Sequence, residues 1–264
     1  MKKKRLDELV VEQGLAETVD LARRLIMAGQ IRSGDRVWEK AGEKVPADTE
    51  LTRKDQPCRW VSRGGLKLEK AFSEFSVTSN KKRCLDIGAS TGGFTHVLLE
   101  FGAAEVVAVD VGWGQLDQKL LMDSRVTVKD RTNFRLLAAH ELGEPFDLVV
   151  ADVSFISLRK ILPKACEMLK PNGEIVALIK PQFEAPRGMV PEGGIITDER
   201  THLMVVTELA EFLQNESRLI LSGLAPVPLV SRRKNIEFVA WWTRIGLSLT
   251  GGRIKEIISA AHQR

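Results

Sequence analysis

The chain has 264 residues and a net charge of +4, with 44% hydrophobic and 28% charged residues, a composition typical of a globular protein with a substantial core. Its apolar runs are far shorter than the ~20 residues of a transmembrane helix, and no apolar signal-peptide core follows the basic start. The three cysteines are widely spaced and fit neither a disulfide framework nor a zinc site. We therefore expect a cytoplasmic protein with no membrane segment and no metal.

The first part of the chain combines helical and strand signals. Apolar residues recur at helical spacing over residues 6–13 and 19–28, and short apolar pairs among turn-forming residues then indicate short strands up to Leu51. We predict a small α+β domain over residues 1–55, followed by a linker and leading helix over residues 56–82. The first 70 residues carry the excess of basic over acidic residues, which favours a polyanionic partner; a merely solvated basic surface is the alternative.

From residue 83 onward, strand-like and helical runs alternate. The strand-like runs are residues 84–87, 106–109, 126–128, 148–150 and 175–179, with later candidates at residues 219–221 and 236–242. The helical runs are residues 94–101, 115–121, 158–169, 198–213 and 252–261. This alternation predicts an α/β domain over residues 83–264, with a mostly parallel seven-stranded sheet and helices on both faces.

A glycine-rich turn leaves the first strand of this domain and enters a helix. The turn and its flanks are Asp86, Ile87, Gly88, Ala89, Ser90, Thr91, Gly92, Gly93 and Phe94. The turn lacks the second glycine of the dinucleotide fingerprint, and Asp86 would repel a phosphate but attract the ammonium of a methionine moiety. These features favour S-adenosylmethionine as the ligand, and a turn that only packs a strand against a helix is the alternative.

Two more acidic residues end neighbouring strands. Asp110 ends the second strand of the domain, where a carboxylate can accept both hydroxyls of an adenosine ribose. Asp130 ends the third strand and is a candidate for the adenine amine, or a plain surface carboxylate. Both residues therefore join the candidate cofactor site.

Five segments, in order along the chain, carry the pattern of a known family. They are residues 61–68, 86–94, 151–157, 179–184 and 235–238. Together they resemble the FtsJ-like ribose methyltransferases, and among them the TlyA-type ribosomal RNA methyltransferases, which are sometimes labelled haemolysins. The resemblance implies a Rossmann-like fold, S-adenosylmethionine as methyl donor, and methylation of a ribose 2′-hydroxyl in ribosomal RNA, at cytidine.

The resemblance also implies four catalytic residues: Lys67, Asp152, Lys180 and Glu237. Asp152 and Lys180 each follow a strand, so both are expected at the carboxyl edge of the sheet, whereas the convergence of Lys67 and Glu237 rests on the resemblance alone. Because a sulfonium methyl is already a strong electrophile, the site must chiefly position the hydroxyl and remove its proton. A lysine acts as a base only where burial or a nearby cation favours its neutral form, and Lys67 would supply that cation for Lys180.

The first domain resembles the small RNA-binding alpha-L motif of ribosomal proteins, in residues 5–7, 22–26 and 28–29. This resemblance implies ribosomal RNA or a ribosomal subunit as partner. The candidate RNA contacts are Arg5, Arg23, Arg24 and Arg63. Thr18 and Val19 stand where the motif has Ser-Arg, so one basic contact is lost.

Other features are expected to be structural. The four histidines lack metal spacing, and Trp241 and Trp242 fit core packing better than base stacking. The loop over residues 184–198 is long enough to be a mobile lid. Two other functions stay open: an RNA-binding or ribosome-assembly factor with vestigial catalysis, and a membrane-active haemolysin, for which the chain shows no spanning or export signal. The sequence gives no indication of the oligomeric state.

Overall fold

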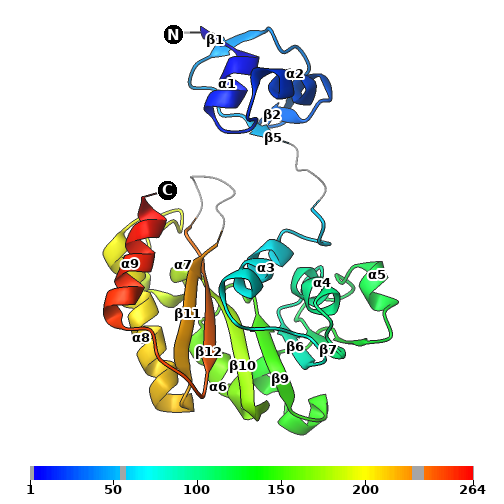
Figure 1. The fold of residues 1–264 in the computed structure, drawn as a ribbon, viewed down its shortest axis with the longest axis vertical. Helices are drawn as coiled ribbons and strands as arrows, with labels where there is room; N and C mark the ends of the chain where they lie inside the picture. Colours follow the sequence, from blue (N-terminus) through cyan, green and yellow to red (C-terminus); the bar gives the residue numbers. More distant parts are fainter. Residues whose placement is uncertain (1–2, 54–57, 228–234, 264) are drawn as a thin grey trace. The chain divides into compact units, whose positions relative to one another are not determined.

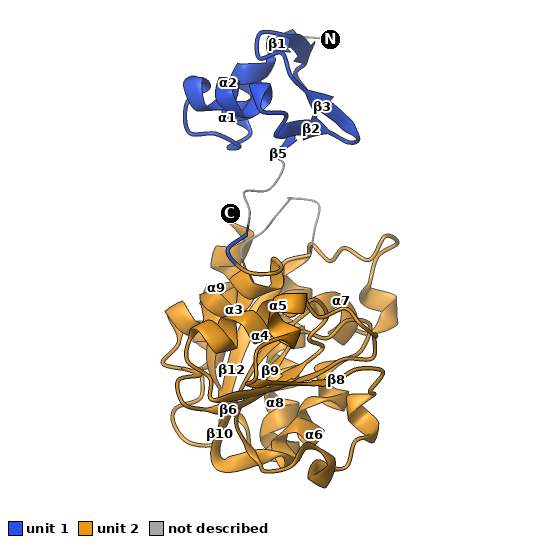
Figure 2. Cartoon of the chain, turned by 90° about the vertical axis from the view of Figure 1, so that its right-hand side faces the viewer, with its two compact units in different colours: residues 1–59 blue, residues 60–264 orange. Residues whose placement is uncertain are grey.

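The computed structural model describes residues 3–53, 58–227 and 235–263. The chain forms two compact units, residues 1–59 and residues 60–264, which Figure 2 shows in different colours. Residues 54–57 of the expected linker lie outside the described part of the chain. The leading helix, α3 (Gly64–Glu74), packs against α4 (Gly93–Glu100) and so belongs to the second unit, whereas the sequence placed it in a segment between the two domains.

The first unit contains two helices and two small antiparallel sheets. Its elements are β1 (Lys3–Arg5), α1 (Leu6–Glu12), α2 (Val19–Met27), β2 (Ile31–Ser33), β3 (Arg36–Trp38), β4 (Lys44–Pro46) and β5 (Thr52–Arg53). Strands β1 and β4 pair with each other, and β2 lies between β3 and β5. Both predicted helices are confirmed. Strand β1 was not predicted, because its pairing partner β4 is distant in the sequence.

The helices of the first unit follow from local chemistry. Thr18 caps α2, since its hydroxyl accepts a hydrogen bond from the Leu21 backbone N–H at 3.2 Å. Gly29 follows α2 with a φ of +65°, a conformation that glycine adopts without steric cost. The apolar faces of both helices meet in one small core, which contains Leu6, Leu9, Val10, Ala22, Leu25, Ile26, Ile31, Trp38 and Val45.

The second unit is built on a seven-stranded sheet with the order β11-β12-β10-β9-β6-β7-β8. The strands are β6 (Arg83–Ile87), β7 (Glu105–Val109), β8 (Val126–Lys129), β9 (Phe146–Ala151), β10 (Leu169–Ile179), β11 (Ile220–Pro226) and β12 (Phe238–Thr243). All neighbouring pairs are parallel except those of β12, which runs antiparallel to both β10 and β11. The predicted mostly parallel α/β sheet is therefore confirmed.

Helices cover both faces of this sheet, as Figure 1 shows. Helices α3 and α4 pack together on one face. On the other face lie α6 (Leu162–Glu167), α8 (Glu199–Ser217) and α9 (Gly251–His262), whose apolar residues share the main core with those of the strands. The remaining helices, α5 (Gln118–Leu121) and α7 (Pro181–Glu184), are single turns beside the strand ends. No helix among the residues described here is long and apolar enough to cross a membrane.

Two predicted helices differ from the structure. The predicted helix over residues 158–169 is a 3-10 turn at Leu158–Lys160 followed by α6, and Leu169 already begins β10 opposite Phe146. The predicted helix over residues 115–121 is shortened to α5, because Asp117 is its N-cap. In both cases the apolar spacing resembled that of a helix, while the pairing of the sheet and the capping residue set the boundary.

Candidate active site

The ends of several strands meet at one edge of the second unit's sheet. Asp152 directly follows β9, and Lys180 directly follows β10, the next strand in the sheet. Glu237 comes just before β12, in which Phe238 pairs with Ile179. Because β12 is antiparallel, it begins at the edge where the parallel strands end, and Glu237 therefore lies near Lys180.

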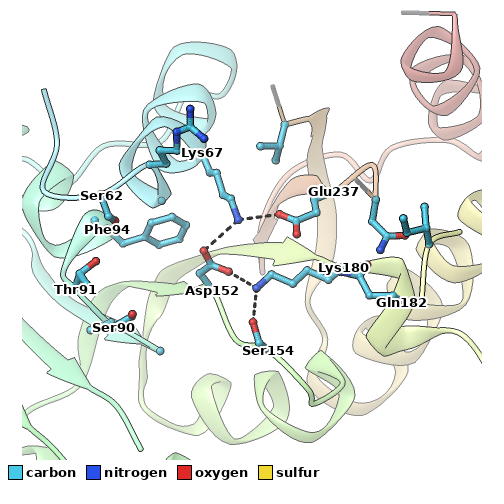
Figure 3. Close-up of a pocket in the computed structure, with 18 residues that line it drawn as sticks. Ser62, Lys67, Ser90, Thr91, Phe94, Asp152, Ser154, Lys180, Gln182 and Glu237 are labelled. Carbon is cyan, nitrogen blue, oxygen red and sulfur yellow. Dashed lines mark hydrogen bonds and ion pairs between the residues drawn. The ribbon is translucent and has the colours of Figure 1, made fainter. Parts of the chain in front are cut away.

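The four predicted catalytic side chains form a continuous chain of alternating charges (Figure 3). The Lys67 ammonium donates to Glu237 Oε2 at 2.8 Å and to Asp152 Oδ2 at 3.4 Å. Asp152 Oδ1 lies 2.6 Å from Lys180 Nζ, which also donates to Ser154 Oγ at 2.9 Å. Asp152 thus lies between the two lysines and contacts each of them through a different oxygen.

Burial and charge act in opposite directions on Lys67. Burial lowers the pKa of Lys67, but the carboxylates of Asp152 and Glu237 raise it more, so its pKa lies above the ordinary value. Lys67 is therefore a fixed cation near neutral pH. Lys180 is the most buried member of the group, with a side chain that is 8% exposed, against 19% for Asp152.

A cavity of about 640 Å³ opens beside these four residues. The glycine-rich turn contributes one wall, and α3 with the segment before it contributes another. Among the residues that line the cavity are Ser62, Arg63, Lys67, Gly88, Ala89, Ser90, Thr91, Gly93, Phe94, Asp152, Ser154, Lys180, Gln182, Ile195, Asn235 and Glu237. The predicted turn and the predicted catalytic residues thus face the same space.

The turn needs glycine at its first position. Gly88 has a φ of +82°, and a Cβ built there would lie 2.8 Å from the backbone oxygen of Asp152. A side chain would therefore collide with the exit of β9 and strain the backbone. Ser90 is also in the left-handed region, with a φ of +49°, and its backbone N–H donates to Asp110 Oδ2 at 2.8 Å.

A second cavity, of about 320 Å³, shares Gly88, Ser90, Asp152 and Ser154 with the first. Asp110 lies in its wall and accepts hydrogen bonds from the backbone N–H groups of Ser90 and Gly112. Most of the remaining wall is apolar. It includes Val109, Val111, Gln115, Thr132, Asn133, Phe134, Val153, Phe155, Ile156 and Ile161. A flat apolar group next to a polyhydroxylated one would match this arrangement.

The other two predicted acidic residues occupy different surroundings. Asp86 is completely buried, and its Oδ2 accepts a hydrogen bond from the Thr95 hydroxyl at 2.7 Å. Its Oδ1 has no hydrogen-bond partner among the described residues, and burial raises the pKa of Asp86 to about 7. Asp130 Oδ2 accepts from the Gly114 backbone N–H at 2.8 Å, so this carboxylate fixes the loop after β7. Neither residue belongs to the cavity walls described above.

The predicted RNA contacts fall in both units. Arg63 lines the larger cavity of the second unit. In the first unit, Arg5 donates to both oxygens of the buried Asp7, and Arg23 donates to Asp7 Oδ2 at 3.0 Å. Arg24 lies 3.7 Å from Asp20 in an exposed pair. Arg5 and Arg23 therefore have a structural bond that the sequence analysis did not foresee, and each is still about half exposed.

Several residues at the site were missed from the sequence. Ser154 and Gln182 belong to the family segments given above and lie two positions after Asp152 and Lys180 in the sequence. This spacing could have placed them at the site. The residues Thr132, Asn133 and Phe134 carry no local motif. Asn235 joins the loop before α8 to the entry of β12, because its amide donates to the Gly194 carbonyl and accepts from the Ile196 N–H, each at 2.8 Å.

The tryptophans and two of the histidines that were expected to be structural make packing contacts inside the second unit. Trp242 is fully buried, and Trp241 stacks on Phe75 at 6.1 Å and donates to Glu174. His202 lies 2.9 Å from His262, between α8 and α9. Within the described ranges, no group of three or more metal-ligating side chains is present. The mobility of the loop over residues 184–198 stays a prediction.

Comparisons with known proteins agree with this architecture. The chain matches the FtsJ-like methyltransferase family over residues 60–241 and the S4 domain over residues 4–51. It is 45% identical to YqxC of Bacillus subtilis, over 99% of this chain and 95% of that protein. It is 42% identical to the 16S/23S rRNA (cytidine-2′-O)-methyltransferase TlyA of Mycobacterium tuberculosis, over 90% of this chain and 88% of that protein. A solved structure from Streptococcus thermophilus, named as a hemolysin, matches with a TM-score of 0.77 and 40% identity, covering 100% of this chain and 97% of that one.

Proposed function

The chain belongs to the FtsJ-like methyltransferase family, and from this premise we propose that it methylates a ribose 2′-hydroxyl of ribosomal RNA with S-adenosylmethionine as donor. The observation that carries the proposal is the ion-paired chain of Lys67, Asp152, Lys180 and Glu237 beside the larger cavity. Such an arrangement can hold a hydroxyl and accept its proton. This matches a reaction whose electrophile is already activated.

The cofactor site is supported by three observations on the residues present. The glycine turn borders both cavities at the exit of β6, through Gly88 and Ser90. The buried Asp86 Oδ1 has no partner among the described residues, and a cationic group nearby would compensate it. Asp110, in the second cavity, has carboxylate oxygens to offer to ribose hydroxyls. When bound, S-adenosylmethionine supplies a methyl group on a positively charged sulfur.

The second cavity fits the adenosine part of this cofactor. Its mostly apolar wall, which includes Phe134 and Ile156, would enclose the flat base, and Asp110 marks the ribose end. Thr132 and Asn133 can exchange hydrogen bonds with the edge of the base. From the sequence, Asp130 was the candidate for this contact. We assign Asp130 instead to holding the loop at Gly114.

Lys180 is the proposed base. Its Nζ takes the proton of the 2′-hydroxyl, while Ser154 and Asp152 hold the amine in place. Lys67 supports this step, because an Asp152 carboxylate that is paired with the Lys67 cation stays compensated when Lys180 is neutral. Glu237 orients Lys67 from its other side. The four residues therefore divide into one proton acceptor and three groups that position it.

Ribosomal RNA is proposed as substrate, with the first unit as an RNA-binding module. The S4 match and the exposed parts of Arg5 and Arg23 support an interaction with the phosphate backbone. The name of the Mycobacterium tuberculosis relative points to cytidine as the target nucleotide. We place this activity in the cytoplasm, where ribosomal subunits are present.

The direct test is mass mapping of ribosomal RNA from cells with and without the gene. A ribose methyl group at a cytidine that disappears with the gene and returns with the wild-type gene, but not with a Lys180→Ala gene, is the expected result. Identical methylation in both strains would contradict the proposal. It would favour an RNA-binding assembly factor, which predicts no cofactor binding by calorimetry.

A further inference from the structure

Glu184 joins two loops of the candidate active site at a distance from the catalytic residues. Its Oε1 accepts a hydrogen bond from the Leu158 backbone N–H at 2.7 Å, and its Oε2 accepts from the Ser157 hydroxyl at 2.6 Å. Leu158 and Ser157 belong to the loop that leaves β9, whereas Glu184 ends α7, the single turn after β10. Both oxygens of one half-buried carboxylate are thus used to fasten one loop to the other.

The same two loops are also joined at the strand ends. Lys180, at the start of the second loop, contacts Asp152 and Ser154 of the first loop, as Figure 3 shows. Residues 152–158 and 180–184 are therefore fastened at both ends, by Lys180 at one end and by Glu184 at the other.

The segment between the two fastenings is conformationally strained. Phe155 has a φ of +62°, in the left-handed region that an aromatic residue rarely adopts. Its side chain is 91% exposed, so burial of the ring does not compensate for this strain. Its main ring contact is Phe183 of the other loop, at a centroid distance of 5.1 Å. A strained conformation persists only where its surroundings hold it. Val153 and Ile156 pack against the main core, and the bonds of Lys180 and Glu184 on both sides of Phe155 add restraints between the two loops.

We propose that Glu184 is a positioning residue for Lys180: by fastening the two loops, it keeps Ser154 and Asp152 where they hold the lysine amine. The inference rests on the proposed methyl transfer and adds a residue that does not touch the reacting atoms. Proton transfer requires correct placement within a fraction of an ångström, so a loop that relaxes around Phe155 would move the Ser154 hydroxyl away from Lys180 Nζ.

The chain offers a conservative variant and a matched control. In Glu184→Gln, the amide oxygen can still accept from Leu158 N–H and the amide nitrogen can donate to Ser157 Oγ, so the fastening is kept without its charge. Glu208 provides the control, because its carboxylate accepts from Arg159, the residue after Leu158, at 3.2 Å but lies on α8 and is half exposed. Glu208→Ala removes a carboxylate contact from Arg159, directly after that segment, without separating the two loops.

The first measurement is single-turnover methyl transfer to ribosomal RNA at saturating cofactor. We expect Glu184→Ala to lower the rate by about 10- to 100-fold, a typical effect of a small misplacement, while Glu184→Gln and Glu208→Ala stay within about 3-fold of wild type. In a Ser154→Ala background, Glu184→Ala should add little, because both changes release the same amine. A fully additive loss, or a Glu184→Ala rate equal to that of wild type, would overturn the proposal.

The second measurement does not depend on activity. Hydrogen exchange should become faster in residues 152–158 of Glu184→Ala, with α8 protected as in wild type and the melting temperature nearly unchanged. Unchanged exchange in that segment, or faster exchange everywhere, contradicts a local fastening. A wild-type protein that transfers no methyl group would refute the proposed function, and the exchange experiment would still decide whether Glu184 fastens the loops.

Discussion

At the scale of single residues, Asp152 is the centre of the site. It separates Lys67 from Lys180, and each lysine has a second partner, Glu237 for the first and Ser154 for the second. Lys67 and Lys180 share the Asp152 carboxylate but are not equivalent, because only Lys67 also pairs with a second carboxylate, that of Glu237. This asymmetry is the reason for assigning the proton transfer to Lys180.

Lys180→Ala should therefore abolish methyl transfer while leaving cofactor and RNA bound. Removal of a general base costs about 10²- to 10⁴-fold in rate, whereas the loss of one ammonium from a large RNA footprint changes affinity little. Lys180→Arg should not restore the rate, because a guanidinium keeps its protons at accessible pH. Single-turnover rates across pH for the three proteins check this. Near-normal turnover in either variant would move the base role to Lys67 or to solvent.

Asp110→Ala is expected to weaken cofactor binding. The Asp110 carboxylate faces the second cavity and also accepts from the backbone N–H groups of Ser90 and Gly112. Each hydrogen bond that it would make to a ribose hydroxyl is lost in the variant, and the loss of one hydrogen bond to a charged group costs about 1.5 to 3 kcal/mol. Calorimetric titration with S-adenosylmethionine measures the effect. Asp130→Ala is the comparison, since its carboxylate holds the same loop from outside the cavity. Equal affinity in Asp110→Ala and wild type would remove Asp110 from the cofactor site.

Asp86 predicts a pH dependence of cofactor binding. Burial raises the pKa of Asp86 to about 7, so the free protein holds a proton there below that pH. A cationic group of the cofactor near Oδ1 would favour the carboxylate, so binding should release a proton below about pH 7 and tighten as pH rises toward that value. Calorimetry in buffers of different ionisation enthalpy measures the released proton. Asp86→Asn should abolish the proton release that comes from Asp86. If this variant releases the same number of protons as wild type, the protons come from the cofactor's own ammonium group.

At the scale of secondary-structure elements, the first unit depends on a buried charge between its two helices. Asp7 of α1 is completely buried and binds Arg23 of α2 as well as Arg5. The hydrogen bond from Arg5 holds the pKa of Asp7 below its ordinary value, an effect that exceeds the opposing influence of burial. Two of the predicted RNA contacts, Arg5 and Arg23, are thus oriented by the same acidic residue.

Asp7→Asn should lower the free energy of unfolding of the first unit by about 1.5 to 3 kcal/mol near neutral pH, the range for hydrogen bonds to charged groups. The folded pKa is lowered, so the stabilisation is present above the ordinary pKa of an aspartate and is lost as pH falls through the folded value. Hydrogen exchange in α2 at a series of pH values measures it. The difference between the two proteins should disappear in acid; a constant difference would show that the lost charge is not its cause.

At the scale of the whole molecule, each unit has its own core. The first contains Leu6 and Ile26 among its buried residues, and the second contains the sheet and its helices. The second unit begins at Trp60, whose ring contacts His96 and lies against Gly65. A truncated protein must therefore keep Trp60 to keep the second core intact.

Deletion of residues 1–59 should leave S-adenosylmethionine affinity unchanged, since both cavities are lined by the second unit. RNA affinity should fall, and its dependence on salt should become weaker, because fewer phosphates are neutralised. Cofactor calorimetry and RNA binding at several salt concentrations check the two parts. A truncated protein with the wild-type salt slope would show that the first unit does not bind the phosphate backbone.

The sequence by itself determined the α+β first unit, the alternation of strands and helices in the second, and the glycine turn before α4. These features depend on local periodicity and on residues such as Gly88, whose left-handed backbone conformation favours glycine over other residues. The tertiary structure alone decided that Glu237 lies beside Lys67, that Asp86 is buried, that Asp130 holds a loop, and that Phe134 lines a cavity. Strand order and register set these positions, and both depend on packing between residues distant in the sequence, which local patterns do not record.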